Sequence, residues 1–465
     1  MKSTRPKVGL LALTLELYET LAPQLRRGRE DWLRRDVLSA LKPVADVNFT
    51  GAVFRRADVE SVVSRFEAEG VDALLVVLLT YSPSQIALPA LARTRLPILI
   101  WNVQELFAVD EAFDQSAMID NHGVHGTQDL ANVLLRSGVR FEYITSHLRD
   151  SGATERLGDF FAAAATVRRL GSARAGLLGY PFPGMGDFAL DTTRLAATLG
   201  VQVVQLSVEE YVNRSAAAES VSELISEYRR CYDVAPGVRE TDLEATGRAE
   251  LALRGMVADH KLDALTYQFM AFGEDERTET VPFVATSRLM AEGIAFGGEG
   301  DVIAAAGTLL LNCLQPPATF SEIFTVDFAG NAVFMSHMGE ANAAMARKDR
   351  RIPLVARSLP ITRTRRGQLA LVTTLQPGPA TFFALTLGPE ARWRLLASQV
   401  EIADFAASAS MEVPYFKLKA RGDVRGFLTS YAKAGGPHHN AVCFGDARRR
   451  LRDAAALLDA EYIEV

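Results

Sequence analysis

The apolar stretch at residues 73–79 (ALLVVLL) restricts the fold of this chain more than any other feature. It shows no alternation of apolar and polar residues, which is typical of a strand buried on both faces of a parallel sheet. Strand-like and helix-like segments alternate around it, the strands at 8–13, 47–49 and 97–102 and the helices at 59–69 and 83–93. This order predicts a doubly wound α/β domain in the N-terminal part of the chain.

A second alternating series follows residue 170. Its strands are expected at 173–180, 201–206 and 262–269, and its helices at 190–199, 240–260 and 284–292. After about Pro316 the strands follow one another across glycine and proline turns until two helices close the chain, which predicts an antiparallel, barrel-like sheet. The predicted fold class is therefore α/β, with two doubly wound open-sheet domains at 1–168 and 169–315 and a β-rich domain at 316–465 that completes the functional site.

The charge balance excludes several classes of partner. The formal net charge is −6 and both signs are mixed along the chain, so we expect no binding to nucleic acid or to an anionic membrane. No run of 18 apolar residues occurs, and the polar N-terminus lacks the apolar core of a signal peptide. Three widely separated cysteines fit a reduced protein, and we expect it to be cytoplasmic.

Histidine is scarce in this sequence, and five of the seven residues lie close to glycine, in segments that resemble turns or strand ends. His122 and His125 belong to DNHGVHG, His337 to SHMG, and His438 and His439 to GGPHHN. Glycine lets a ligand approach the backbone closely, so titratable imidazoles among glycines indicate an active site. The alternative interpretation of each single histidine is a turn or capping hydrogen bond.

Two carboxylates stand in unusual surroundings. Glu299 lies between glycines in FGGEGD, in a predicted strand-to-helix loop, which is where open α/β sheets bind ligands. Glu322 lies in the apolar segment TFSEIF, where a buried carboxylate needs a partner or a metal ion. The alternatives are an acid beside a helix start and an exposed acid, respectively. Carboxylates and imidazoles together suit Mn²⁺ or a similar ion, although no short motif such as HExxH supports a metal site.

Four longer motifs occur in order along the chain. They are RLMAEGIAFGGEGD at 288–301, TFSEIFTVDF at 319–328, SHM with Glu340 at 336–340, and GGPHH at 435–439. In this order they resemble the L-arabinose isomerase family, which is itself related to L-fucose isomerase. The resemblance covers roughly residues 260–440 and is fainter in the N-terminal half, where it rests on the α/β order and the pair of His125 and Gly126.

The resemblance implies a metal site made by Glu299, Glu322, His337 and His439, the last being the second histidine of GGPHH. Mn²⁺ is the expected ion, with Co²⁺ and Mg²⁺ as further candidates. For Asp301, next to the site, we expect either a helix-capping role or the orientation of a metal ligand.

The family also brings a histidine from a neighbouring subunit's N-terminal domain towards the sugar, and His125 matches that position. The resemblance thus implies a homotrimer or homohexamer, and we expect His125, Tyr18 and His438 to bind the substrate. Near Tyr18 the sequence departs from the family, because TLELY at 14–18 replaces Ser-Gln-His-Leu-Tyr and puts Leu15 at the glutamine position. The recognised pattern of sugar hydroxyls is therefore expected to differ.

The implied reaction is aldose–ketose isomerisation of a free, L-arabinose-like pentose or a related sugar. Metal-bound oxygens on C1 and C2 activate the substrate, and Glu299 and Glu322 serve as the acid/base pair that moves a proton from C2 to C1 through a cis-enediol. Two alternatives stay open, a sugar epimerase on the same scaffold and a non-catalytic sugar-binding protein.

Overall fold

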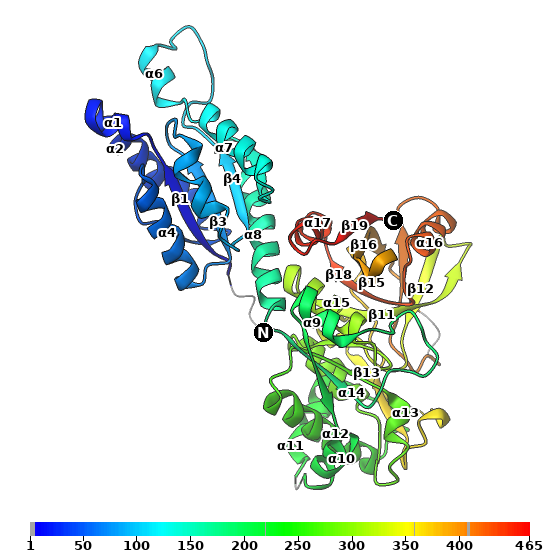
Figure 1. Ribbon diagram of the computed structural model, residues 1–465. Helices are drawn as coiled ribbons and strands as arrows, with labels where there is room; N and C mark the ends of the chain where they lie inside the picture. The colour runs from blue at the N-terminus through cyan, green and yellow to red at the C-terminus, as the bar shows by residue number, and fades with distance from the viewer. Residues whose placement is uncertain (1–4, 219, 358, 407–409) are drawn as a thin grey trace. The chain divides into compact units, whose positions relative to one another are not determined.

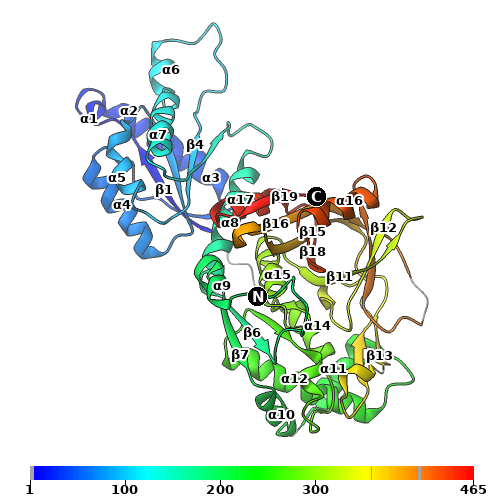
Figure 2. The same ribbon diagram turned by 45° about the vertical axis from the view of Figure 1, so that its right-hand side comes forward.

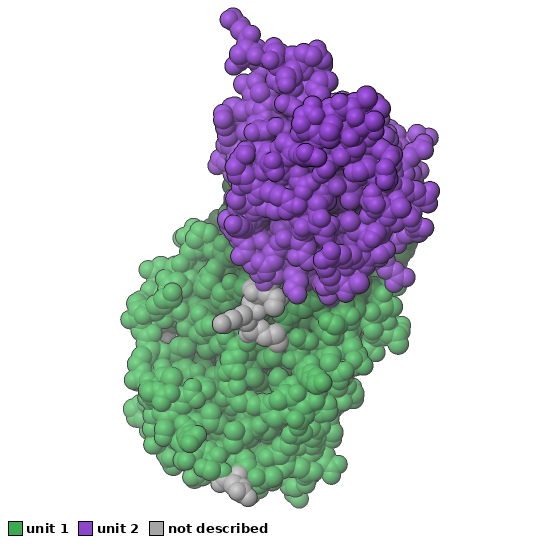
Figure 3. Space-filling view, turned by 90° about the vertical axis from the view of Figure 1, so that its left-hand side faces the viewer, with its two compact units in different colours: residues 1–3, 169–465 green, residues 4–168 purple. Residues whose placement is uncertain are grey.

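The computed structural model describes residues 5–218, 220–357, 359–406 and 410–465, which form two compact units (Figure 3). The N-terminal unit ends at Arg168, and the larger unit starts at Arg169. No helix in these described ranges is long and apolar enough to cross a membrane.

The N-terminal unit is built on a parallel sheet with the strand order β2-β1-β3-β4-β5 (Figure 1). The strands are β1 (Lys7–Leu13), β2 (Asp46–Asn48), β3 (Ala73–Leu78), β4 (Ile98–Asn102) and β5 (Glu142–Thr145). The main helices are α1 (Glu16–Leu21), α2 (Pro23–Trp32), α4 (Arg56–Glu69), α5 (Leu88–Leu91), α6 (Gln115–Asp120), α7 (Val124–Arg136) and α8 (Ala153–Leu170). Every residue of β3 is buried, as its unbroken apolar sequence predicts.

The larger unit begins with a second parallel sheet, in the order β10-β9-β6-β7. Its strands are β6 (Arg174–Leu178), β7 (Gln202–Leu206), β9 (Ala264–Tyr267) and β10 (Ala295–Gly297). Its helices are α9 (Thr192–Leu199), α10 (Val208–Ala216), α11 (Ser222–Cys231), α12 (Glu240–Asp259), α13 (Phe269–Phe272), α14 (Phe283–Ala291) and α15 (Val302–Leu314). Parallel strands and intervening helices confirm the second α/β pattern.

Helix α15 joins this sheet to the rest of the larger unit (Figure 2). Its sequence is apolar almost all round, and it contacts β10 of the parallel sheet as well as β18 and β15 of the following sheet. A helix without a polar face has to be buried between two layers. Because both sheets pack against α15, a domain boundary at residue 315 is a proposal. The division of the chain into domains at 1–168, 169–315 and 316–465 is likewise a proposal.

The C-terminal part is a closed antiparallel barrel of six strands, in the order β15-β18-β11-β12-β17-β16, with β15 pairing to β16. The strands are β11 (Ala318–Asp327), β12 (Ala332–Ser336), β15 (Gly378–Leu387), β16 (Trp393–Ile402), β17 (Tyr415–Ala420) and β18 (His439–Phe444). Strand β19 (Glu461–Glu464) adds to β16 in parallel, and helices α16 (Val424–Lys433) and α17 (Arg448–Leu457) accompany the barrel. The predicted β-rich, barrel-like sheet is confirmed.

Several boundaries differ from the sequence-based prediction. The helix expected at 83–93 is only a 3-10 turn (Ser84–Ile86) and the short α5, which starts next to Pro89. His125 lies in the first turn of α7 rather than in a loop, and a small sheet of β8 (Tyr232–Val234), β13 (Ile352–Arg357) and β14 (Gln368–Leu371) was not expected as a unit. Short segments of this kind are decided by tertiary packing more than by local pattern.

Candidate metal centre

Strand register brings part of the candidate site together. Glu322 on β11 lies directly opposite His439 on β18 and, on its other side, opposite Ser336 on β12. Residues that oppose each other on antiparallel strands share one face of the sheet, so Glu322 and His439 are neighbours although they are distant in sequence. His337 follows Ser336 at the end of β12. One edge of the barrel therefore carries three of the four predicted ligands.

The fourth predicted ligand, Glu299, lies in the loop between β10 and α15. Glu299 has a φ of 58°, a left-handed conformation that non-glycine residues adopt rarely. A Cβ at Gly298 would lie 2.8 Å from the His337 Nε2, so glycine at this position leaves room for the imidazole. Gly300 has a φ of 82°, and a Cβ there would meet the Tyr180 carbonyl at 2.4 Å. Gly298 thus allows the loop to approach the barrel, and Gly300 allows it to approach the segment that follows β6.

These side chains form two overlapping groups of potential ligand atoms. One is Glu299, His438 and His439, and the other is Glu322, His337 and His439; within each group the atoms lie within 4.8 Å of one another. The Glu299 Oε2 is 3.8 Å from the His439 Nε2 and 3.9 Å from the His438 Nε2. His337 and His439 are both buried.

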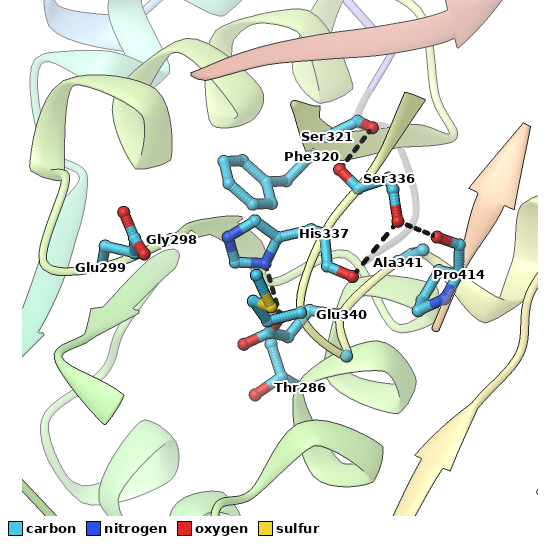
Figure 4. A network of polar contacts seen from close by, with 12 residues as sticks. Thr286, Gly298, Glu299, Phe320, Ser321, Ser336, His337, Glu340, Ala341 and Pro414 are labelled. Carbon is cyan, nitrogen blue, oxygen red and sulfur yellow. Dashed lines mark hydrogen bonds and ion pairs between the residues drawn. The ribbon is translucent and has the colours of Figure 1, made fainter. Parts of the chain in front are cut away.

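A second carboxylate fixes each buried imidazole from behind. The His337 Nδ1 bonds to Glu340 at 2.6 Å (Figure 4). The other oxygen of Glu340 accepts the Tyr267 hydroxyl at 2.5 Å. The His439 Nδ1 lies 2.9 Å from Asp301, whose other oxygen accepts the backbone N–H of Ala304 at the start of α15. A carboxylate on Nδ1 orients the ring with its Nε2 towards a metal ion. Asp301 therefore caps α15 and also holds the ring of His439.

The residues present fit a bound divalent ion. Among the described residues, the Nε2 atoms of His337, His438 and His439 are buried and have no hydrogen-bond partner. A buried polar atom without a partner costs free energy, which metal coordination removes. Two imidazole nitrogens and two carboxylates form a mixed set that suits Mn²⁺, Co²⁺ or Mg²⁺ better than a thiolate-preferring ion.

The surroundings shift the pKa values of the two acids in opposite directions. Burial raises the pKa of the Glu322 carboxyl above its ordinary value. Burial acts in the same sense on Glu299, but the nearby His438, His337 and His439 outweigh it and leave its pKa lowered. Burial also holds the pKa of His439 well below the usual range, which keeps this imidazole neutral, as a metal ligand must be.

The predicted substrate-binding residues lie in two different places. Tyr18 on α1 and His125 on α7 belong to the N-terminal unit, where the Tyr18 hydroxyl is 2.8 Å from the His122 Nε2 and the His125 ring stacks on Tyr81 at 4.8 Å between centroids. His438 belongs to the larger unit, directly beside the proposed ligand His439. The N-terminal residues thus form their own cluster of histidine and tyrosine side chains.

Sequence reasoning missed some partners of these residues. Tyr81 stacks on His125, and Asp187 bonds to His438, which are remote from them in the sequence. Tyr267 reaches His337 through Glu340. No local sequence pattern indicates these contacts. Glu340 is three residues after His337, and this spacing in a turn after a strand was the one signal that could have assigned its role.

Three family models match successive parts of the chain. Residues 33–171 match the fucose/sulfoquinovose isomerase N-terminal domain, residues 175–315 the L-arabinose isomerase central domain, and residues 317–461 the L-arabinose isomerase C-terminal domain. Together they extend across the N-terminal unit and the larger unit.

Individual proteins agree with these matches. The L-arabinose isomerase of Acidothermus cellulolyticus is 27% identical over 419 residues, which is 85% of this chain and 81% of the relative. That of a Nocardioides species is 28% identical over 402 residues, covering 83% of this chain and 78% of the relative. A solved solute-binding protein from Actinobacillus succinogenes with bound D-allose covers 63% of this chain and 78% of its own at 14% identity, with a TM-score of 0.16, which carries no argument about the fold.

Proposed function

This chain belongs to the L-arabinose isomerase and L-fucose isomerase superfamily of aldose–ketose isomerases, and we propose that it isomerises a free sugar with a divalent metal ion bound by Glu299, Glu322, His337 and His439. The observation that carries the proposal is the set of buried Nε2 atoms that lie near two carboxylates and have no hydrogen-bond partner among the described residues. Of the candidate ions we propose Mn²⁺ first, because the set combines imidazole with carboxylate.

The side chains around the proposed ligands support a rigid site. Phe320 on β11 contacts the rings of both His337 and His439 edge-on, with centroids 4.7 and 5.0 Å away. Phe188 stacks on the His439 ring at 5.6 Å. Aromatic packing and the two outer carboxylates hold both imidazoles, so little side-chain freedom is lost when an ion binds.

The proposed chemistry is a proton transfer between two adjacent carbons. When bound, the metal ion supplies Lewis-acid polarisation of the sugar's oxygens. Glu299 on the loop and Glu322 on the barrel strand reach the site from different elements, which suits one carboxylate to accept the proton from C2 and the other to assist its return at C1. The intermediate is a cis-enediol, and the sugar leaves as a ketose.

The substrate proposed is an unphosphorylated pentose that resembles L-arabinose, or a related sugar. The names of the relatives support this class. Leu15 stands where the related sequences would place a polar residue, so we propose a preference that differs in at least one hydroxyl. An epimerase remains the second candidate, since the same acid/base pair could return the proton to the opposite face of the carbon.

We propose a homotrimer or homohexamer in the cytoplasm. Support for assembly comes from exposed apolar side chains that follow β1 and β4 in the N-terminal unit, namely Leu17, Leu21, Phe107, Val109, Met118 and Val124. The carboxyl ends of parallel strands meet at one edge of a sheet, and apolar residues gathered there favour burial against another subunit. Three free cysteines fit a reduced compartment.

A screen of aldoses tests the proposed function. Metal-stripped protein is reloaded with Mn²⁺, Co²⁺ or Mg²⁺ and supplied with pentoses, tetroses and deoxyhexoses. We expect a ketose from at least one sugar, only in the loaded protein. Sugar binding without turnover, unaffected by EDTA, would instead support a non-catalytic sugar-binding protein.

A further inference from the structure

Asp187 makes a paired contact with His438 that the isomerase chemistry described above does not use. It lies in the segment between β6 and α9, and one of its oxygens, Oδ2, accepts two hydrogen bonds from the same residue. The backbone N–H of His438 donates at 3.1 Å and its Nδ1 lies at 2.5 Å. This double contact fixes both the position of His438 and the direction of its ring.

The consequence is a defined direction for the other ring nitrogen. With Nδ1 held by Asp187, the Nε2 points away from that carboxylate, is buried and has no partner among the described residues. It lies 3.9 Å from the Glu299 Oε2, a separation too long for a hydrogen bond. The His438 Nε2 therefore faces the site, where a bound molecule can supply its hydrogen-bond partner.

The two adjacent histidines, His438 and His439, differ in their exposure and in their neighbours. His439 is completely enclosed, has Asp301 behind it and belongs to both groups of potential metal ligands, whereas His438 belongs to one group only and has 30% of its side chain exposed. Each histidine thus has its own carboxylate on Nδ1, Asp301 for His439 and Asp187 for His438. The inner one suits the ion, and the outer one suits a molecule that enters from solvent.

We propose that Asp187 is a positioning residue for substrate binding, which holds the His438 imidazole so that its Nε2 bonds to an oxygen of the bound sugar. A sugar hydroxyl both donates and accepts hydrogen bonds, so it satisfies Nε2 in either protonation state of the ring. The inference rests on the proposed function, because it requires the sugar to occupy this site.

The test separates sugar binding from metal binding. Asp187→Ala, Asp187→Asn and His438→Gln are compared with wild type, with Asp191→Asn as the matched control. Asp191 lies on the same segment, and its carboxylate accepts hydrogen bonds from the backbone N–H and the hydroxyl of Thr193 at the start of α9. Calorimetry gives the affinity for Mn²⁺ and, in the Mn²⁺-loaded protein, for L-arabitol, a sugar alcohol that cannot react. Turnover of the best aldose gives kcat and KM.

We expect Asp187→Ala to weaken L-arabitol binding and raise KM about tenfold or more, since a charge-assisted hydrogen bond is lost. Mn²⁺ affinity should stay within about threefold, and Asp187→Asn, which keeps an acceptor oxygen, should recover most of the loss. In a His438→Gln background, Asp187→Ala should add less than about twofold, because the effect acts through the histidine. Asp191→Asn should match wild type.

Three outcomes would overturn the inference. The first is an unchanged affinity for L-arabitol in Asp187→Ala. The second is a double variant whose loss of sugar affinity equals the product of the losses in Asp187→Ala and His438→Gln. The third is a Mn²⁺ affinity that falls more than about tenfold in either single variant, which would make His438 a metal ligand. If Asp187→Ala does not fold, Asp187→Leu, which also removes both acceptor oxygens, decides the question through the same affinities. Wild type that binds neither Mn²⁺ nor L-arabitol and converts no sugar contradicts the proposed function instead.

Discussion

Glu322 of strand β11 faces His439 of strand β18 in antiparallel register, and the adjacent loop brings Glu299 within 3.8 Å of the same imidazole. A carboxylate on a strand, a histidine on its neighbour and a carboxylate on a left-handed loop therefore meet at one edge of the barrel. This relationship makes the effects of removing single side chains specific enough to predict.

Substitution of His439 should abolish tight metal binding. In His439→Ala we expect the affinity for Mn²⁺ to fall at least about a hundredfold, because this residue belongs to both ligand groups. A hundredfold excess of ion over its Kd should stabilise wild type by about 2.7 kcal/mol, and the variant should lose this stabilisation. Thermal unfolding with and without Mn²⁺ measures it. His260→Ala, at a half-buried histidine paired with Glu210, is the control and should respond to Mn²⁺ as wild type does.

The outer carboxylate Glu340 should matter nearly as much as a ligand. Glu340→Gln weakens the hold on the His337 Nδ1 and disturbs the hydrogen bond from Tyr267, so we expect Mn²⁺ affinity to fall about 10- to 100-fold. Tyr267→Phe should have a smaller effect, since it leaves the Glu340–His337 contact in place. Calorimetric titration measures both, and Glu276→Gln, on the surface, is the control. Equal affinity in Glu340→Gln and wild type would show that His337 needs no support from Glu340.

The N-terminal cluster should affect the sugar and not the ion. Tyr18→Phe removes the hydroxyl that bonds to His122, and we expect KM to rise several-fold while Mn²⁺ affinity is unchanged. Steady-state kinetics on the best aldose, together with calorimetry, separates the two quantities. If KM and kcat both stay at their wild-type values, Tyr18 has no part in substrate binding.

A salt bridge remote from the site predicts a pH dependence of stability. Burial of Glu279 raises its pKa, but Arg248 and Arg366 outweigh this and leave the pKa below the ordinary 4.5. A carboxyl whose pKa is lowered on folding stabilises the protein above its unfolded pKa, and this contribution disappears as the pH falls through the folded pKa. Glu279→Gln should therefore cost about 1 kcal/mol at pH 7, after allowance for partial exposure, and progressively less below about pH 4.5.

Thermal unfolding of Glu279→Gln and wild type in a series of buffers from pH 7 to pH 3.5 provides the measurement. A difference that persists undiminished at the acidic end would mean that packing rather than charge accounts for it. Glu276→Gln again serves as the matched variant, because its side chain is exposed.

The sequence predicted the architecture best where a segment is apolar throughout. The unbroken apolar run of β3 was recognisable because complete burial leaves no polar positions. The short strands β8 and β13 were not, because they pair with each other from distant parts of the chain and their stability comes from that pairing. Local pattern carries no information about such a partner.

The same difference between local patterns and long-range contacts decided which residues of the candidate site could be predicted. Glu299 and Glu322 could be selected because glycine neighbours and an apolar setting are visible locally. The choice of His439 over His438 depended on the family resemblance, and the structure adds a physical difference, since different carboxylates hold the two rings. Asp187 lies on a different element from His438, and only the fold brings them together.

The central claim is tested most directly by carbon NMR of an aldose incubated in deuterated water with the Mn²⁺-loaded wild type and with Glu322→Gln. The account predicts that wild type forms the ketose, with its carbonyl at C2 and deuterium at C1, and that Glu322→Gln and EDTA-treated wild type form at least about a hundredfold less. An aldose inverted at C2 with its carbonyl still at C1, or ketose formation that is indifferent to EDTA and to Glu322, would contradict it.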